Sequence, residues 1–150
     1  MSQPTAATEP GPSILAERTL LGIFVHFIAI LPFVGFVATA VIYLVSTHEF
    51  TRANARNALN WHLLVGGSFL ATFVLLFGLD ALFESVPVPG LLETAVFVPV
   101  FLLTFGAIAL GFLSVFVWIV AMAKAIFGEA WEYPFAPAFV GADADGDRPS

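Results

Sequence analysis

Three long stretches of the chain carry no charged side chain, and they constrain the fold more than any other feature. They are Thr19–His48, Asn57–Leu79 and Thr94–Ala123. Each contains about 20 or more mostly apolar residues, which as an α-helix would cross the roughly 30 Å hydrocarbon core of a bilayer. Charged side chains are costly at mid-membrane, and here they lie between or outside these stretches. The pattern predicts an all-α integral membrane bundle of three transmembrane helices.

The composition supports a membrane protein and excludes several function classes. Of the 150 residues, 59% are hydrophobic and 11% are charged, against roughly 25% charged in an average soluble domain. The chain has no cysteine, which excludes disulfides and thiolate metal sites. A net charge of −6 argues against a nucleic-acid partner. The acidic balance also fits a halophile.

The chain contains no sequence motif of an enzyme. It has no P-loop, no glycine-rich dinucleotide fingerprint, no GxSxG and no HExxH. The spacing of its three histidines matches no metal motif. We therefore expect a protein that is not an enzyme, with no catalytic residue, cofactor or metal site.

The stretches divide the chain into one membrane domain and two polar ends. Pro32 and Gly35 are expected to kink the first span without ending it. Met1–Glu17 lacks a basic n-region, so the first span is interpreted as retained and not as a signal peptide. The prediction is a disordered tail over 1–13, a membrane domain over 14–140 with spans at about 20–45, 58–79 and 95–123, and an acidic disordered tail over 141–150.

Basic residues predict the orientation of the three spans. Arg52 and Arg56 lie in the first connector, Lys124 follows the third span, and the Asp80–Glu93 connector has no basic residue. The positive-inside rule then predicts a multi-pass protein of the cell (plasma) membrane with its N-terminus outside and its C-terminus in the cytoplasm. Arg18 opposes this arrangement.

Aromatic residues agree with that orientation. Every Tyr and Trp maps to the same predicted side, which indicates a one-sided interfacial belt. These residues are Tyr43, Trp61, Trp118, Trp131 and Tyr133.

Each span also carries small residues on one face, where helices can approach closely. In the third span this face includes Gly111 and Ser114, and in the second it includes Gly67 and Gly78. In the first span the face includes Gly22 and His26, with Ala29 one turn further along. We expect these faces to form the helix–helix contacts of the bundle.

Few side chains are candidates for binding. His26 is interpreted as a histidine hydrogen-bonded across the bundle, with a proton relay or ligand as the alternative. Arg52, Arg56 and Asn60 follow one helical face at i, i+4 and i+8, and His62 lies next to them. This stripe is either a site for lipid phosphates or a partner, or a pair of snorkelling arginines that anchor a helix end.

The segment after the third span is expected to lie in the membrane interface. Trp131 and Tyr133 would anchor it among headgroups, and Pro134 prevents a regular helix. We predict that it folds back under the bundle, so that Glu129 or Glu132 meets one of the two connector arginines.

Two local patterns resemble those of a known family. Residues Arg56 to His62 read RNALNWH, similar to an "R-x-A-L-N-(aromatic)-(Q/H)" entry to a span, and residues Gly128 to Phe135 read GEAWEYPF, similar to "G-E-x-W-x-Y-P". With His26, they resemble the domain of unknown function 4870 family of small prokaryotic membrane proteins. That family is related to Tic-type import channel subunits of the chloroplast inner envelope. The resemblance implies this architecture and a link to protein translocation.

Three functions remain open on these observations. The resemblance implies a component or accessory of a protein translocation or insertion assembly. The alternatives are a small homo-oligomeric channel or transporter, and a structural or lipid- or partner-binding envelope protein. The expected partners are membrane lipid and protein partners in the membrane or further copies of the chain.

Overall fold

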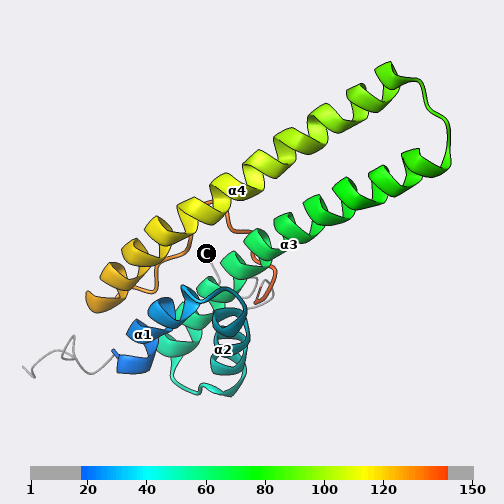
Figure 1. Cartoon of the computed structure of the whole chain (residues 1–150). Helices are drawn as coiled ribbons and strands as arrows, with labels where there is room; N and C mark the ends of the chain where they lie inside the picture. The colour runs from blue at the N-terminus through cyan, green and yellow to red at the C-terminus, as the bar shows by residue number, and fades with distance from the viewer. Residues whose placement is uncertain (1–17, 142–150) are drawn as a thin grey trace, which may run out of the picture.

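Residues 18–141 form four helices, and two of them are long (Figure 1). The computed structural model describes residues 18–141, and over this range it contains no β-strand. The predicted all-α class is therefore confirmed for the described residues. The predicted tail over 1–13 and nearly all of the tail over 141–150 lie outside them. The helices are α1 (Leu20–Ala29), α2 (Pro32–Val45), α3 (Glu49–Ser85) and α4 (Gly90–Ile126).

The long helices α3 and α4 form an antiparallel hairpin (Figure 1). Both are long and apolar enough to cross a membrane. Each has 37 residues, about 55 Å of helix at 1.5 Å per residue. They contain the second and third uncharged stretches but extend beyond them, because α3 already begins at Glu49 and only residues 86–89 separate it from α4. Pro99 lies inside α4 and does not interrupt it.

The first uncharged stretch is not a single span, so the prediction of three transmembrane helices is not confirmed. It folds into the 10-residue α1 and the 14-residue α2. The chain reverses at Leu31, which is extended, and Pro32 then begins α2, where its missing N–H costs no helical hydrogen bond. Gly35 lets α2 pack closely on α1, because a Cβ atom there would lie 2.7 Å from the carbonyl oxygen of Ile28.

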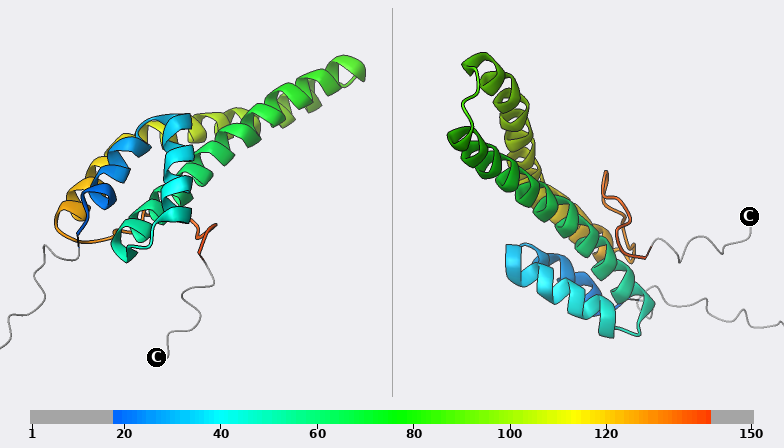
Figure 2. Two further views of the ribbon diagram at one scale, coloured as in Figure 1. Left: turned by 90° about the horizontal axis from the view of Figure 1, so that it is seen from below. Right: turned by 90° about the vertical axis from the view of Figure 1, so that its right-hand side faces the viewer.

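The short hairpin of α1 and α2 lies beside one end of α3 (Figure 2). α1 runs parallel to α3 from Thr19, whose hydroxyl is hydrogen-bonded to that of Thr51. α2 returns along the same part of α3. Its Phe36 ring lies edge-on to His62, and its Tyr43 ring lies under the guanidinium of Arg52. We call α1 and α2 the short hairpin.

Both ends of the described chain therefore meet at one end of the molecule. Arg18 donates a hydrogen bond to the carbonyl of Ile126 at the end of α4. This arrangement of the described residues gives no support to the prediction that the N-terminus and the C-terminus lie on opposite sides of the membrane. We call this end the base (residues 18–62 and 107–141) and the opposite end, where α3 and α4 are joined, the tip (residues 80–93).

Packing in the base places small and polar residues inside and large apolar residues outside. Val25 and His26 are fully buried in the short hairpin, whereas Phe33 and Leu44 are 79% and 77% exposed. Exposed apolar side chains on this scale suit a lipid environment and would be a liability in water. The buried core cluster consists of Ala29, Ala58, Trp61, Val117, Trp118, Ala121 and Tyr133.

The predicted small-residue faces differ in how deeply they are buried. Gly22 of α1 is buried, as are Ala107 and Ser114 of α4. Gly67 and Gly78 of α3 are exposed, with no atom within 4 Å of a Cβ built on either. The predicted face of the second span is therefore wrong, because α3 beyond the short hairpin has α4 as its only helical neighbour within the described residues.

A labelling experiment tests the hairpin arrangement. Single cysteines at Ser13, Ser46 and Ser85 can be introduced into this cysteine-free chain and probed with an impermeant thiol reagent in sealed membrane vesicles. Ser13→Cys and Ser46→Cys should be labelled from the same side, because α1 and α2 return to the base. Ser85→Cys should be labelled from the other side. Labelling of Ser13→Cys and Ser46→Cys from opposite sides would restore a first helix that crosses the membrane.

Candidate functional site

The end of α4 turns the chain back toward α3. Gly128 has a φ of +87°, a conformation that glycine adopts without strain. The N–H of Glu129 donates to the carbonyl of Lys124 at 3.0 Å, and the N–H of Gly128 donates to that of Ala125. This is the Schellman pattern that ends many helices. It directs residues 128–141, which we call the return segment, along the base.

A chain of hydrogen bonds through His26 joins three parts of the base. Asn54 donates through Nδ2 to the carbonyl of Phe50 at 2.9 Å, so its Oδ1 accepts from His26 Nε2 at 2.7 Å. His26 Nδ1 then accepts from the Tyr133 hydroxyl at 2.5 Å. His26 and Asn54 are fully buried, and Tyr133 is 4% exposed. The expected hydrogen-bonded histidine is therefore present, and it ties α1 to α3 and to the return segment.

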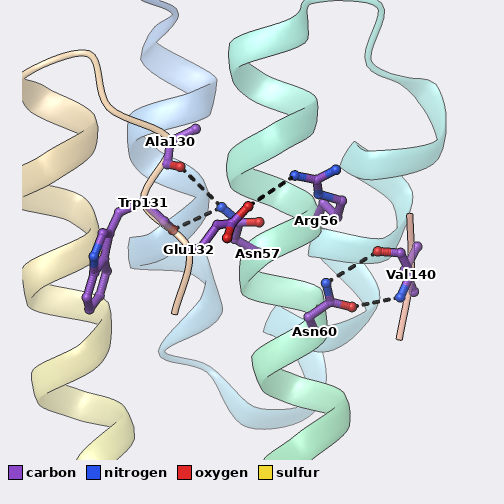
Figure 3. A network of polar contacts seen from close by, with 7 residues as sticks. All are labelled: Arg56, Asn57, Asn60, Ala130, Trp131, Glu132 and Val140. Atoms are coloured by element: carbon purple, nitrogen blue, oxygen red, sulfur yellow. Dashed lines mark hydrogen bonds and ion pairs between the residues drawn. The ribbon is translucent and has the colours of Figure 1, made fainter. Parts of the chain in front are cut away.

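Two asparagines of α3 hold the return segment through its backbone (Figure 3). Asn57 donates through Nδ2 to the carbonyls of Ala130 and Trp131, at 3.4 and 2.9 Å. Asn60 forms a reciprocal pair with Val140, donating to its carbonyl at 3.3 Å and accepting from its N–H at 2.9 Å. These amides satisfy backbone groups of a segment that has no secondary structure of its own.

The ion pairs at the rim of the base are weaker than these hydrogen bonds. Arg56 Nη2 lies 4.0 Å from Glu132 Oε1, one of the four pairings expected from the sequence (Figure 3). Lys124 Nζ lies 2.8 Å from Glu129 Oε2. The Glu132 side chain is 77% exposed and that of Glu129 is 52% exposed, so each pair contributes about 0–1 kcal/mol. Between Arg56, Asn60 and the return segment remains a cleft of about 140 Å³.

The side chains of the predicted polar stripe point to different neighbours in the structure. Arg52 lies over the Tyr43 ring, 5.2 Å from its centroid, while Arg56 and Asn60 face the return segment. The three side chains therefore do not present one surface to lipid phosphates. His62 faces Phe36 and the ring of Trp118.

The aromatic residues gather at the base, and three of them are buried in its core, namely Trp61, Trp118 and Tyr133. Trp61 is fully buried and donates through Nε1 to the Ser114 hydroxyl at 2.9 Å. Tyr133 packs edge-on to Trp61, and Trp131 packs against Tyr133. The expectation that Tyr133 anchors the segment among headgroups is therefore wrong, because its ring fills the core and its hydroxyl binds His26.

Two further sequence candidates have structural positions. Gly111 lies where α4 faces α3, and a Cβ built on it would be 3.4 Å from the Phe69 ring. Pro134 is exposed in a turn of the return segment, next to Phe135, whose φ is +67°.

The tip carries charge of one sign. Asp80, Glu84 and Glu93 are exposed there, and Asp80 and Glu93 line the same shallow hollow between α3 and α4. Within residues 18–141, no group of three or more His, Cys, Asp or Glu side chains could hold a metal ion. The tip therefore offers separate carboxylates and not an enclosed metal site.

Asn54 and Asn57 were not recognised as site residues from the sequence. Together with Asn60 they recur at i, i+3 and i+6, which places them along one side of a helix. Three asparagines with this spacing, next to an apolar stretch, are the signal that was available. They point to buried hydrogen bonds, because an amide without a partner is costly inside a membrane.

Comparisons with known proteins identify the family. A sequence model of the MamF/MmsF magnetosome magnetite crystal formation protein family matches residues 17–140. The match covers most of the chain, which therefore belongs to this family. No curated protein and no solved structure matches the chain.

This match corrects the family resemblance drawn from the sequence. The chain does not belong to the domain of unknown function 4870 family or to the Tic-related proteins. The translocation hypothesis rested on that resemblance alone and loses its support. The match gives no support to the halophile interpretation either. Family membership and two helices long enough to cross a bilayer identify a membrane protein, whereas the channel alternative stays a prediction.

Removing the Tyr133 hydroxyl is the smallest change that tests the buried chain of hydrogen bonds through His26. Tyr133→Phe should lower the free energy of unfolding by about 1–3 kcal/mol, because it leaves His26 Nδ1 buried without a partner. Thermal unfolding in mild detergent measures the change. Tyr43→Phe is the matched control, since the structure shows no hydrogen bond to that hydroxyl among the described residues, and it should change stability by less than about 0.5 kcal/mol. Equal effects would remove the special role of Tyr133.

Alkaline pH provides a second test of the same hydroxyl. Burial raises the pKa of Tyr133 above its ordinary value of about 10. The folded protein therefore keeps this proton at a pH where the unfolded chain releases it. The resulting stability is fully present below about pH 10 and is lost as the pH rises further. We expect the Tm of the wild type to fall more steeply above pH 10 than that of Tyr133→Phe. Parallel curves would contradict the burial of this group.

Proposed function

We propose that this member of the magnetosome magnetite crystal formation protein family acts in the membrane without catalysing a reaction, and that its tip presents carboxylates to iron. The observation that carries the proposal is the separation of charge along the α3–α4 hairpin. The charged side chains of the tip are all acidic, whereas all basic side chains of the described residues lie at the base. The family description supplies the mineral context.

The distribution of charge gives the hairpin a direction in the membrane. Among the described residues, all four basic side chains lie at the base, and no basic residue lies at the tip. The positive-inside rule then favours a cytoplasmic base and a tip on the opposite face, toward the compartment where a crystal would form. Arg18 no longer opposes the rule, because the short hairpin brings the N-terminal end of α1 to the base. The basic residues are Arg18, Arg52, Arg56 and Lys124.

The chemistry of the tip suits a surface that carries many metal ions. Carboxylate oxygens are preferred ligands of hard cations. Asp80 and Glu93 share one hollow, and Glu84 is exposed near the end of α3. Since these groups do not enclose an ion, they would act together on neighbouring iron ions of a mineral surface. Several weak contacts on one support bind more tightly together than each does alone. Once one carboxylate is bound, the others are held near the surface at a high effective concentration.

Lipid is the other partner in this proposal. Large apolar side chains cover the outside of both helical hairpins. They would hold the tip at a fixed height above the membrane, and the α3–α4 hairpin would keep its carboxylates close together. The protein would then contribute position and charge to crystal formation, with no reaction of its own.

Binding of the tip to magnetite can be measured directly. The full chain is placed in lipid nanodiscs, which leave both faces accessible, and is co-sedimented with magnetite particles. The variant carrying Asp80→Asn, Glu84→Gln and Glu93→Gln should lose most of the bound protein, because the carboxylates that contact iron are gone.

The matched control carries the same number of neutralised acids at the base. These substitutions are Glu49→Gln, Glu129→Gln and Glu132→Gln, and this variant should bind nearly as well as the wild type. If the tip variant bound like the wild type, or if both variants lost binding equally, the tip would not be the mineral-facing surface.

A further inference from the structure

The base and the tip half differ in width. The base has four helices and the return segment, whereas residues 63–106 contain only the two arms of the α3–α4 hairpin (Figure 2). Burial follows the same division. The buried residues of α3 lie between Thr51 and His62 except for Thr72, and those of α4 lie between Ala107 and Ala125 except for Val100. The molecule therefore narrows abruptly where the short hairpin ends.

The outer face of the short hairpin is suited to lipid along its whole length. Phe24 and Phe27 of α1 are more than half exposed, as are Leu31 at the turn and Leu44 at the end of α2. The polar atoms of the hairpin point inward, toward Asn54 and Thr51 of α3. The short hairpin thus enters the membrane from the base and returns to it.

The turn of the short hairpin borders an apolar groove. Pro32 and Phe33 line this groove together with Gly66 and Phe69 of α3. The groove marks the step between the wide and the narrow part of the molecule. Lipid chains can fill this space, since no helix of the described residues occupies it.

Depth along α3 shows that the step lies within one leaflet. The uncharged part of α3, Asn57–Leu79, is about 34 Å long at 1.5 Å per residue, so a modest tilt fits it to the roughly 30 Å hydrocarbon core. Gly66, beside the hairpin turn, lies about 14 Å along that length from Asn57. The short hairpin therefore reaches less than halfway across the membrane.

From this shape we infer that the protein recognises strongly curved bilayers, with its base in the convex leaflet. An α-helix is about 10 Å wide, so α1 and α2 add roughly 160 Å² of cross-section to one leaflet only. In a flat bilayer the two leaflets have equal area and this excess compresses lipids on one side. In a small vesicle the convex leaflet has the larger area and accommodates it. Interfacial insertions are sensitive to curvature for this reason.

The inference does not depend on the chemistry of the tip, so it can fail while the mineral-binding proposal holds. It is consistent with that proposal, because a base in the convex leaflet leaves the tip on the enclosed side of a vesicle.

Reconstitution into vesicles of mixed size tests the inference on the unmodified fold. The full chain carrying Ser85→Cys is labelled with a dye, and protein and lipid fluorescence are measured on single vesicles of one lipid composition. We expect the protein density per membrane area to be several-fold higher in the smallest vesicles than in the largest. In the smallest vesicles a cysteine at Ser46 should also be labelled mainly from outside. Equal density at all sizes, or random orientation in the smallest vesicles, would overturn the inference.

A variant of the short hairpin adds a structural control. Gly35→Leu should weaken the dependence on vesicle size, because the new side chain forces α2 away from Ile28 and Ala29. Gly78→Leu is the matched control in the narrow part, where a Cβ meets nothing within 4 Å, and it should keep the dependence. An undiminished dependence in a folded Gly35→Leu would argue against the short hairpin as its cause. If Gly35→Leu does not fold, the size and orientation measurements on the Ser85→Cys and Ser46→Cys chains decide the inference.

Discussion

The structure of the base depends on His26. Inside a membrane a polar group without a partner costs several kcal/mol, which creates a strong requirement for partners within the chain itself. His26 meets this requirement with one nitrogen toward Asn54 of α3 and the other toward Tyr133 of the return segment. The short hairpin, the α3–α4 hairpin and the return segment are therefore held at a single ring. Apolar contacts with lipid hold none of these parts in register, because they do not distinguish one neighbour from another.

The two ends of the α3–α4 hairpin have different physical properties. The base contains the buried polar groups, the basic residues and the width of the molecule. The tip contains exposed acids and little packing beyond contacts such as that of Phe83 with Phe97. A well-packed base and a slender acidic end fit the proposed role, in which lipid holds the base and the tip meets a mineral surface.

Much of this arrangement could be predicted from the sequence, and the exceptions have physical reasons. The uncharged stretches predicted α3 and α4, since length and apolarity decide whether a helix can cross a bilayer. They could not distinguish a kink from a reversal at Pro32, because a proline fits both, and the close approach of Gly35 to Ile28 arises only once the chain has folded. Arg18, which opposed the predicted orientation, was the sign of that reversal. The contact of Arg56 with Glu132 was expected from opposite charges, whereas the bonds of Asn57 were missed because their partners are backbone carbonyls, which no side chain reveals.

The position of Tyr133 in the chain has a consequence for synthesis. α1 is made first, and the group that satisfies His26 Nδ1 is made more than a hundred residues later, after both long helices. Until the return segment is made, the short hairpin in the membrane has a polar nitrogen, His26 Nδ1, without this partner. A chain released before residue 133 would therefore keep a defect that a membrane protease or chaperone can detect. Formation of the contact between His26 and Tyr133 therefore shows that synthesis has passed both long helices.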